Sequence, residues 1–96
     1  MNMCGGMSGA KVMTPEMFSK FVSLKPAIQI KAGKTYTVFE PISFKSQVVA
    51  GTNYVAKIKV DGEKCIHAKM FEPLPYTGDP ISVTSVEVDK QIGDAL

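Results

Sequence analysis

Alternation of apolar and polar residues in the second half of the chain constrains the fold more than any other feature. Stretches 36–44, 54–60 and 65–71 follow a period of two, which is typical of strands that bury one face. Asp61-Gly62 separates the last two stretches and is a strong hairpin signal, while Pro41 predicts a bulge in the first. Another strand is expected over 81–88, where the apolar residues change phase near Ser85. The pattern predicts an antiparallel meander.

Residues 14–33 have the pattern of a helix. Thr14 can cap its N-terminus, Pro15 suits the first position, and Gly33 suits the end. Pro26 removes one backbone hydrogen bond inside this stretch, so we expect a bend or an irregular second half. The predicted buried stripe consists of apolar residues at helical spacing: Met17, Phe18, Phe21, Val22, Leu24 and Ile28. One helix packed across a four- to five-stranded antiparallel sheet gives an α+β fold.

The length of 96 residues predicts one domain, spanning residues 1–96. Apolar residues make up 45% and charged residues 21%, which is typical of a globular chain and excludes wholesale disorder. Residues 1–13 are rich in Met and Gly, so we interpret them as an extended, mobile N-terminal trunk.

Charge and cysteine content exclude several classes of partner. The net charge is +2 and all eleven basic residues are lysine, so the chain lacks the arginine-rich footprint of a nucleic-acid-binding protein. No apolar run is long enough for a membrane span, and the N-terminus has no secretory pattern. Two cysteines, Cys4 and Cys65, favour reduced thiols over a disulfide. We therefore expect a cytoplasmic protein, with unconventional secretion left open.

Two connections of the predicted meander contain unusual residues for loops. Successive turns fall at alternate ends of an antiparallel sheet, so the turn near 47–52 and the loop 73–80 share one end. Val48 and Val49 cannot both point into the core, because consecutive strand residues face opposite sides. Prolines stiffen the second loop, and Leu74 adds apolar area. The alternatives are an exposed apolar partner site and ordinary loops with buried side chains.

The first of these turns also resembles a known family. Gln47-Val48-Val49-Ala50-Gly51, followed by Thr52-Asn53-Tyr54, is similar to the first hairpin of the cystatins in their stefin form. Ordered similarities to stefins extend over nearly the whole chain, namely Met3-Cys4-Gly5, Leu24-Lys25-Pro26, Ser43-Phe44-Lys45-Ser46, His67-Ala68-Lys69-Met70-Phe71, Leu74-Pro75 and Val88-Asp89-Lys90. The resemblance implies a cystatin-like fold and reversible, tight inhibition of papain-like cysteine proteases, including cathepsins.

In that family a three-part wedge blocks the active-site cleft. Carried over to this sequence, the resemblance implies protease-binding residues in the trunk, first hairpin and second loop: Cys4, Gly5, Gln47, Val48, Val49, Ala50, Gly51, Leu74, Pro75 and Tyr76. Tyr76 is a candidate for choosing among proteases. We expect a 1:1 complex with no metal or cofactor, and a monomer for which a domain-swapped dimer is left open.

Two rival functions use the same residues differently. The chain could be a non-inhibitory binding module with the same fold and loops, or a very small enzyme that uses Cys65 and His67. A catalytic Cys–His pair needs a third group that orients the histidine, and the sequence signals none. A zinc site needs about four ligands. Structural roles are therefore favoured for both residues. Lys57, Lys59 and Lys69 are interpreted as a solvated sheet face.

Overall fold

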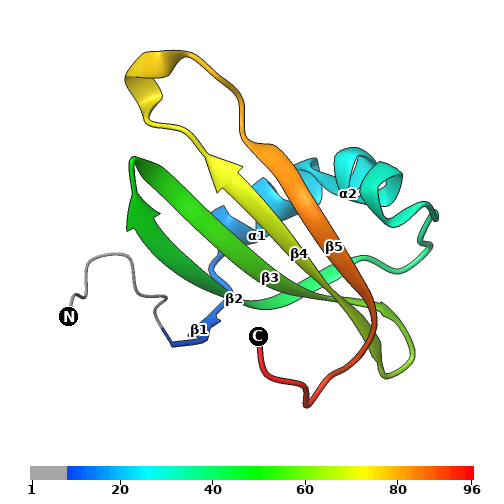
Figure 1. Cartoon of the computed structure of the whole chain (residues 1–96). Coiled ribbons are helices and arrows are strands. Elements are labelled where there is room, and N and C mark those ends of the chain that lie inside the picture. The colour runs from blue at the N-terminus through cyan, green and yellow to red at the C-terminus, as the bar shows by residue number, and fades with distance from the viewer. Residues whose placement is uncertain (1–8) are drawn as a thin grey trace.

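The computed structural model describes residues 9–96 and consists of two helices on one face of a five-stranded antiparallel sheet (Figure 1). The predicted α+β class is therefore confirmed. The elements are β1 (Lys11–Val12), α1 (Pro15–Ser23), α2 (Lys25–Ala32), β2 (Glu40–Val49), β3 (Gly51–Asp61), β4 (Lys64–Glu72), a 3-10 turn (Pro75–Thr77) and β5 (Ser82–Gln91). Within the described residues, neither helix has the length and apolar character needed to cross a membrane.

The strands follow one another in the order β1-β2-β3-β4-β5. Because each neighbour is antiparallel, the β2–β3 turn and the β4–β5 loop lie at the same end of the sheet, as predicted (Figure 1). The β3–β4 turn lies at the other end. Asp61 pairs with Lys64, so the turn residues are Gly62 and Glu63, one position later than expected, and Gly62 supplies the positive φ of 47°.

The single predicted helix is in fact two consecutive helices that break at Leu24. Thr14 Oγ1 accepts a hydrogen bond from the Met17 amide at 3.2 Å, and Gly33 closes α2 with a φ of 73°. Pro26 stands in the first turn of α2, where a missing amide hydrogen costs little. The break is thus the way in which the chain accommodates this proline.

The core lies between the helices and the covered face of the sheet. The aromatic rings of Phe21, Phe44 and Tyr54 meet edge to face, with centroid separations of 5.7, 5.7 and 6.2 Å. Phe21 and Ile28 are fully buried, as predicted for the helical stripe, but the prediction was wrong for Phe18, which is 39% exposed. The remaining buried core residues come mainly from the alternating strands, namely Ala56, Ile58, Val60, Ile66, Ala68 and Met70.

Two segments at the edges of elements differ from the prediction. Residues 1–13 were expected to form a mobile arm, but Lys11 and Val12 pair with Phe44 and Ser43 as the edge strand β1. Conversely, residues 36–38 precede β2 and are not part of a strand. Tyr36 is nevertheless buried in the core, where it packs from the segment between α2 and β2. The prediction of a strand at this position was therefore wrong, although the prediction of a buried side chain is confirmed.

Two register shifts of the sheet occur where the sequence indicated them, whereas those between Lys59 and Asp61 and between Cys65 and His67 were not predicted. The β2–β3 register shifts between Pro41 and Ser43, as expected from the proline. Met70 pairs with Val83 while Lys69 pairs with Ser85, so one extra residue enters β5 at the predicted phase change.

Candidate functional site

The first loop is a very tight hairpin with an apolar tip. Gln47, Val48 and Val49 pair with Asn53, Thr52 and Gly51, so only Ala50 lies between the strands. The Asn53 side-chain amide donates a 3.2 Å hydrogen bond to Gln47 Oε1 and closes the base of the hairpin. Val48 is 72% exposed and Val49 45% exposed. The expectation that these valines cannot both enter the core is confirmed, since both remain at the surface.

Gly51 joins this hairpin to the neighbouring strand. Its φ is 124°, a conformation that residues with side chains rarely adopt. A Cβ at this position would lie 2.6 Å from the Glu72 carbonyl oxygen and 2.7 Å from Phe71 Cζ. Glycine is therefore required by both the backbone conformation and the space, and its absence of a side chain brings the first loop against the start of the second.

The second loop is stiffened by its own hydrogen bonds. The Leu74 carbonyl accepts hydrogen bonds from the Thr77 amide at 3.0 Å and the Thr77 hydroxyl at 2.8 Å. The Asp79 amide in turn donates to Thr77 Oγ1 at 3.2 Å, and Gly78 has a φ of 75°. The loop thus holds a 3-10 turn rather than an open coil, and proline is not its only source of rigidity.

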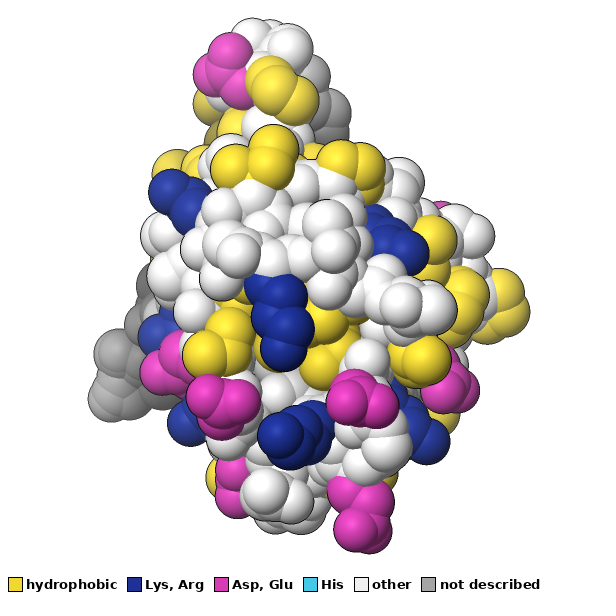
Figure 2. All heavy atoms as spheres, turned by 90° about the vertical axis from the view of Figure 1, so that its right-hand side faces the viewer, with side chains coloured by type: hydrophobic (Ala, Val, Ile, Leu, Met, Phe, Trp, Pro, Cys, Tyr) yellow, Lys and Arg dark blue, Asp and Glu magenta, His cyan; other side chains and the backbone are white. Residues whose placement is uncertain are grey.

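The two loops form one protruding apolar end of the molecule. Leu74 is partly buried at the base of the second loop, Pro75 opens its 3-10 turn, and Tyr76 is 84% exposed at its tip. Figure 2 shows this loop projecting at the top of the molecule with hydrophobic side chains on it. Of the residues singled out from the sequence, the structure therefore brings together those of the first hairpin and second loop.

The trunk residues Cys4 and Gly5 lie outside the described residues. The strand β1, which follows these residues in the chain, runs antiparallel to β2. The N-terminal residue of β1, Lys11, is therefore the one nearer to the end of the sheet that carries both loops. The Lys11 ammonium donates a 3.2 Å hydrogen bond to Ser46 Oγ and lies 5.9 Å from the Phe44 ring, which ties β1 to its neighbour.

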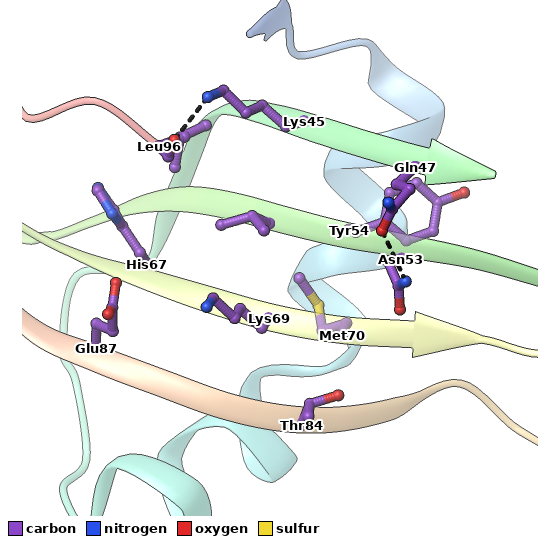
Figure 3. A pocket seen from close by; sticks show the side chains of 11 residues that line it. Lys45, Gln47, Asn53, Tyr54, His67, Lys69, Met70, Thr84, Glu87 and Leu96 are labelled. Carbon is purple, nitrogen blue, oxygen red and sulfur yellow. Dashed lines mark hydrogen bonds between the residues drawn. The ribbon is translucent and has the colours of Figure 1, made fainter. Parts of the chain in front are cut away.

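The open face of the sheet carries a feature that the sequence analysis missed. Lys57 was expected to be solvated but is only 8% exposed, because residues 92–96 fold back over the strands. Its ammonium donates hydrogen bonds to the carbonyls of Ile92 and Asp94, and Lys45 Nζ donates to the Leu96 carbonyl at 2.6 Å. A hollow of about 420 Å³ lies beside this segment, between Lys45, Gln47 and Glu87 (Figure 3).

Cys65 and His67 occupy the buried positions expected of packing residues. They are 1% and 2% exposed, and His67 Nε2 has no hydrogen-bond partner among the described residues. Burial lowers the pKa of His67, and the nearby Lys57 and Lys90 ammonium groups lower it further. Burial also raises the pKa of the Cys65 thiol, which disfavours the reactive thiolate. The described residues contain no group of three potential metal ligands.

The described residues thus form a small α+β protein with two stiff, exposed loops that carry apolar side chains at one end of the sheet. Exposed apolar patches of this kind are typical of interaction sites. Comparison with known proteins identifies the family. The cystatin domain model matches residues 28–93. Similar proteins include Cystatin-A1 of Sus scrofa, with 40% identity over 98% of this chain and 91% of that protein. The chain belongs to the cystatin family.

Two further relatives support the resemblance to the stefin type. Cystatin-B of Mus musculus is 37% identical over 98% of this chain and 96% of its own length. A Sus scrofa protein named leukocyte cysteine proteinase inhibitor 1 is 39% identical over 98% of this chain and 91% of its own length. The chain thus spans almost the full length of these relatives, and the family predicted from the hairpin motif is confirmed.

Proposed function

We propose that this protein is a reversible, tight-binding inhibitor of papain-like cysteine proteases, including cathepsins. The observation that carries the proposal is the pair of exposed apolar loops at one end of the sheet, in a chain that belongs to the cystatin family. One relative is itself named a cysteine proteinase inhibitor. The inhibitor acts by occupying the active-site cleft, not by reacting with it.

The two loops supply the apolar contact. Val48, Val49 and Ala50 enter from the first hairpin, and Leu74, Pro75 and Tyr76 enter from the second loop. Each apolar side chain that becomes fully buried contributes about 1.5–3 kcal/mol. Gln47 and Gly51 shape the hairpin, through the side-chain hydrogen bond to Asn53 and the positive φ respectively. Because both loops are ordered in the free protein, little conformational entropy is lost on binding.

The trunk is the third part of the proposed wedge. Lys11 of β1 pairs with Phe44 of β2. The number of residues from Lys11 back to Gly5 equals the number from Phe44 forward to Ala50. A trunk that continues the extended direction of β1 is therefore long enough to reach the tip of the first hairpin. Cys4 and Gly5 then fill the cleft on one side of the catalytic thiolate, while Gly5 lets the backbone pass without presenting a peptide bond for attack.

The proposed complex contains one inhibitor and one protease, because both exposed apolar loops among residues 9–96 lie at the same end of the sheet. The free protein is proposed to be a monomer, and a domain-swapped dimer would require β2 and β3 to straighten at the tight hairpin. A cytoplasmic location stays a prediction from the cysteine content.

Titration of papain with the protein tests the proposal. With enzyme at nanomolar concentration and a small chromogenic substrate, the expected result is a linear loss of activity that ends at one equivalent of protein. Absence of inhibition at micromolar concentration would contradict the proposal and leave the non-inhibitory binding module. Peptide hydrolysis by the protein itself, abolished by Cys65→Ser, would instead support the small enzyme, although Cys65 is buried.

A further inference from the structure

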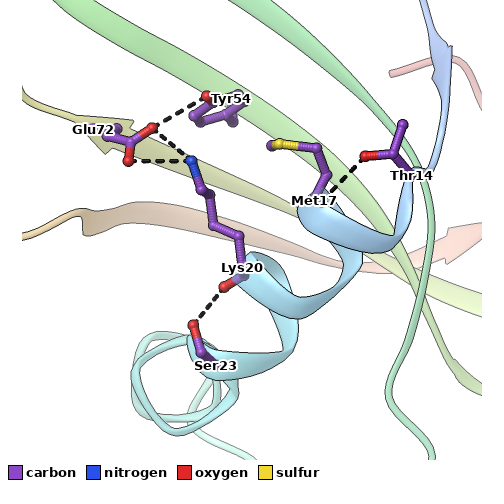
Figure 4. A network of polar contacts seen from close by, with 6 residues as sticks. All are labelled: Thr14, Met17, Lys20, Ser23, Tyr54 and Glu72. Carbon is purple, nitrogen blue, oxygen red and sulfur yellow. Dashed lines mark hydrogen bonds and ion pairs between the residues drawn. The ribbon is translucent and has the colours of Figure 1, made fainter.

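A polar network lies at the base of the two loops (Figure 4). Glu72 is the last residue of β4, so the second loop begins with the residue that follows it. Its carboxylate accepts hydrogen bonds from Lys20 Nζ of α1 at 2.9 and 3.2 Å and from the Tyr54 hydroxyl of β3 at 3.2 Å. The Lys20 ammonium also lies 5.6 Å from the Tyr54 ring centroid. Three elements therefore converge on one carboxylate.

The pair of Lys20 and Glu72 is partly shielded from solvent. The side chains of Lys20 and Glu72 are only 30% and 37% exposed. Burial lowers the pKa of Lys20. The hydrogen bond to Glu72, together with electrostatic attraction to Tyr54, Glu72 and Glu16, outweighs that effect and leaves the pKa above its ordinary value. A carboxylate held by two donors from different elements has fewer accessible orientations than an isolated surface pair.

Glu72 is also connected to the first loop through its backbone. It is the cross-strand partner of Thr52, the residue that follows Gly51. The Glu72 carbonyl and the Phe71 ring are the atoms against which Gly51 packs. The main chain of Glu72 therefore contacts the first hairpin, while its side chain contacts α1. Both contacts lie at the point where the second loop leaves the sheet.

We propose that Glu72, held by Lys20, is a positioning residue that fixes the second loop relative to the first hairpin, so that both enter the protease cleft together. This inference rests on the proposed inhibitory function and assigns a role to side chains that need not touch the protease. Without the brace, the second loop keeps its internal hydrogen bonds but must be fixed relative to the first hairpin during binding, and that cost appears mainly as faster dissociation.

The experiment compares Glu72→Gln with the matched variant Glu87→Gln. Glu87 forms the other ion pair among the described residues, with Lys90 at 3.8 Å on β5, so the control removes the same charge and also breaks a pair. Association and dissociation rates with papain are measured at pH 7.5, together with thermal stability. We expect Glu72→Gln to speed dissociation by about five- to tenfold, as for loss of one ordered loop contact, and Glu87→Gln to leave it unchanged.

Two further variants separate positioning from a general structural role. The charge exchange Lys20→Glu with Glu72→Lys restores an ion pair at the same place and is expected to recover most of the lost residence time. In a Leu74→Ala background, Glu72→Gln is expected to have little further effect, because the braced loop then contributes less.

The inference is overturned if Glu72→Gln dissociates at the wild-type rate, if it lowers stability alone, or if its effect is undiminished in the Leu74→Ala background. Failure of the wild-type protein to inhibit papain would instead count against the proposed function. These two failures are distinguished by the wild-type titration.

Discussion

Gly51 packs directly against Glu72, so closely that a Cβ on Gly51 would lie 2.6 Å from the Glu72 carbonyl oxygen. This contact links the tip of the first hairpin to the base of the second loop. The hairpin glycine is therefore important for the relative placement of the two loops as well as for the turn itself.

Replacement of this glycine tests that role. Gly51→Ala forces a side chain into a φ of 124° and against both a carbonyl and the Phe71 ring, so we expect the free energy of unfolding to fall by about 1–3 kcal/mol. Urea denaturation measures the change. Gly93→Ala is the control, because a Cβ there meets nothing within 4 Å. Equal stability of the two variants would show that the backbone around Gly51 yields without cost.

Val48 offers a test of contact with the protease without a change in the fold. The side chain is 72% exposed, so Val48→Ala should leave the free energy of unfolding within about 0.5 kcal/mol of wild type. Loss of about two methyl groups from a buried interface should weaken papain inhibition by roughly tenfold. Val38→Ala is the matched control, since Val38 is also exposed but lies in the segment between α2 and β2. Similar inhibition constants for both variants would contradict the hairpin's role.

His67 predicts a dependence of stability on pH. Burial and the nearby Lys57 and Lys90 hold the pKa of folded His67 below its ordinary value of 6.5. The unfolded chain therefore takes up a proton first as the pH falls, and the contribution of neutral His67 to stability is lost from pH 6.5 downward to the folded pKa. His67 contributes at most about 1.4 kcal/mol per pH unit to the slope of the free energy of unfolding against pH.

Urea denaturation between pH 7.5 and pH 5 measures this slope. The carboxylates of Glu87 and Asp94 raise the pKa of His67 and so oppose the effect of burial. The wild-type protein is therefore compared with His67→Gln, because this variant removes the imidazole but keeps both carboxylates. The variant is expected to show a shallower decline in stability over this interval. An unchanged slope would mean that His67 does not titrate differently in the folded and unfolded protein.

The sequence predicted those features that depend on local patterns. Alternation along β2 to β5 specified which faces are buried, and Pro41 and Ser85 marked irregular positions that the strand registers confirm. The hairpin motif identified residues that the structure brings together at one end. These predictions succeeded because side-chain direction in a strand follows directly from position in the chain.

Other features depend on contacts that no local pattern records. Lys57 looks like a solvated strand residue, and only the return of residues 92–96 over the open face buries it. Tyr36 continues an alternating pattern but packs into the core from a loop. The interaction of Lys20 with Glu72 joins residues 52 positions apart. Such contacts arise from the tertiary path of the chain, which periodicity does not determine.

Lys57 is expected to hold the C-terminal segment on the sheet. Lys57→Met keeps the apolar stem but removes the ammonium that binds the carbonyls of Ile92 and Asp94, so residues 92–96 should separate from the sheet. Hydrogen–deuterium exchange in this segment should rise by roughly tenfold, as for a loss of about 1–2 kcal/mol. Lys59→Met is the control on the same strand. Equal exchange in wild type and Lys57→Met would show that other contacts hold the segment.

The trunk gives a final prediction, on residues that precede the described part of the chain. Deletion of residues 1–5, or Gly5→Trp, should weaken papain inhibition by about tenfold or more, because the deletion removes apolar contact and the tryptophan obstructs the close approach of the backbone. Gly93→Trp is a suitable control, since that position is open and lies in the C-terminal segment. Thermal unfolding of every variant ensures that altered inhibition does not reflect loss of the fold. Inhibition constants that are the same before and after truncation would refute a role for the trunk and confine the wedge to the two loops.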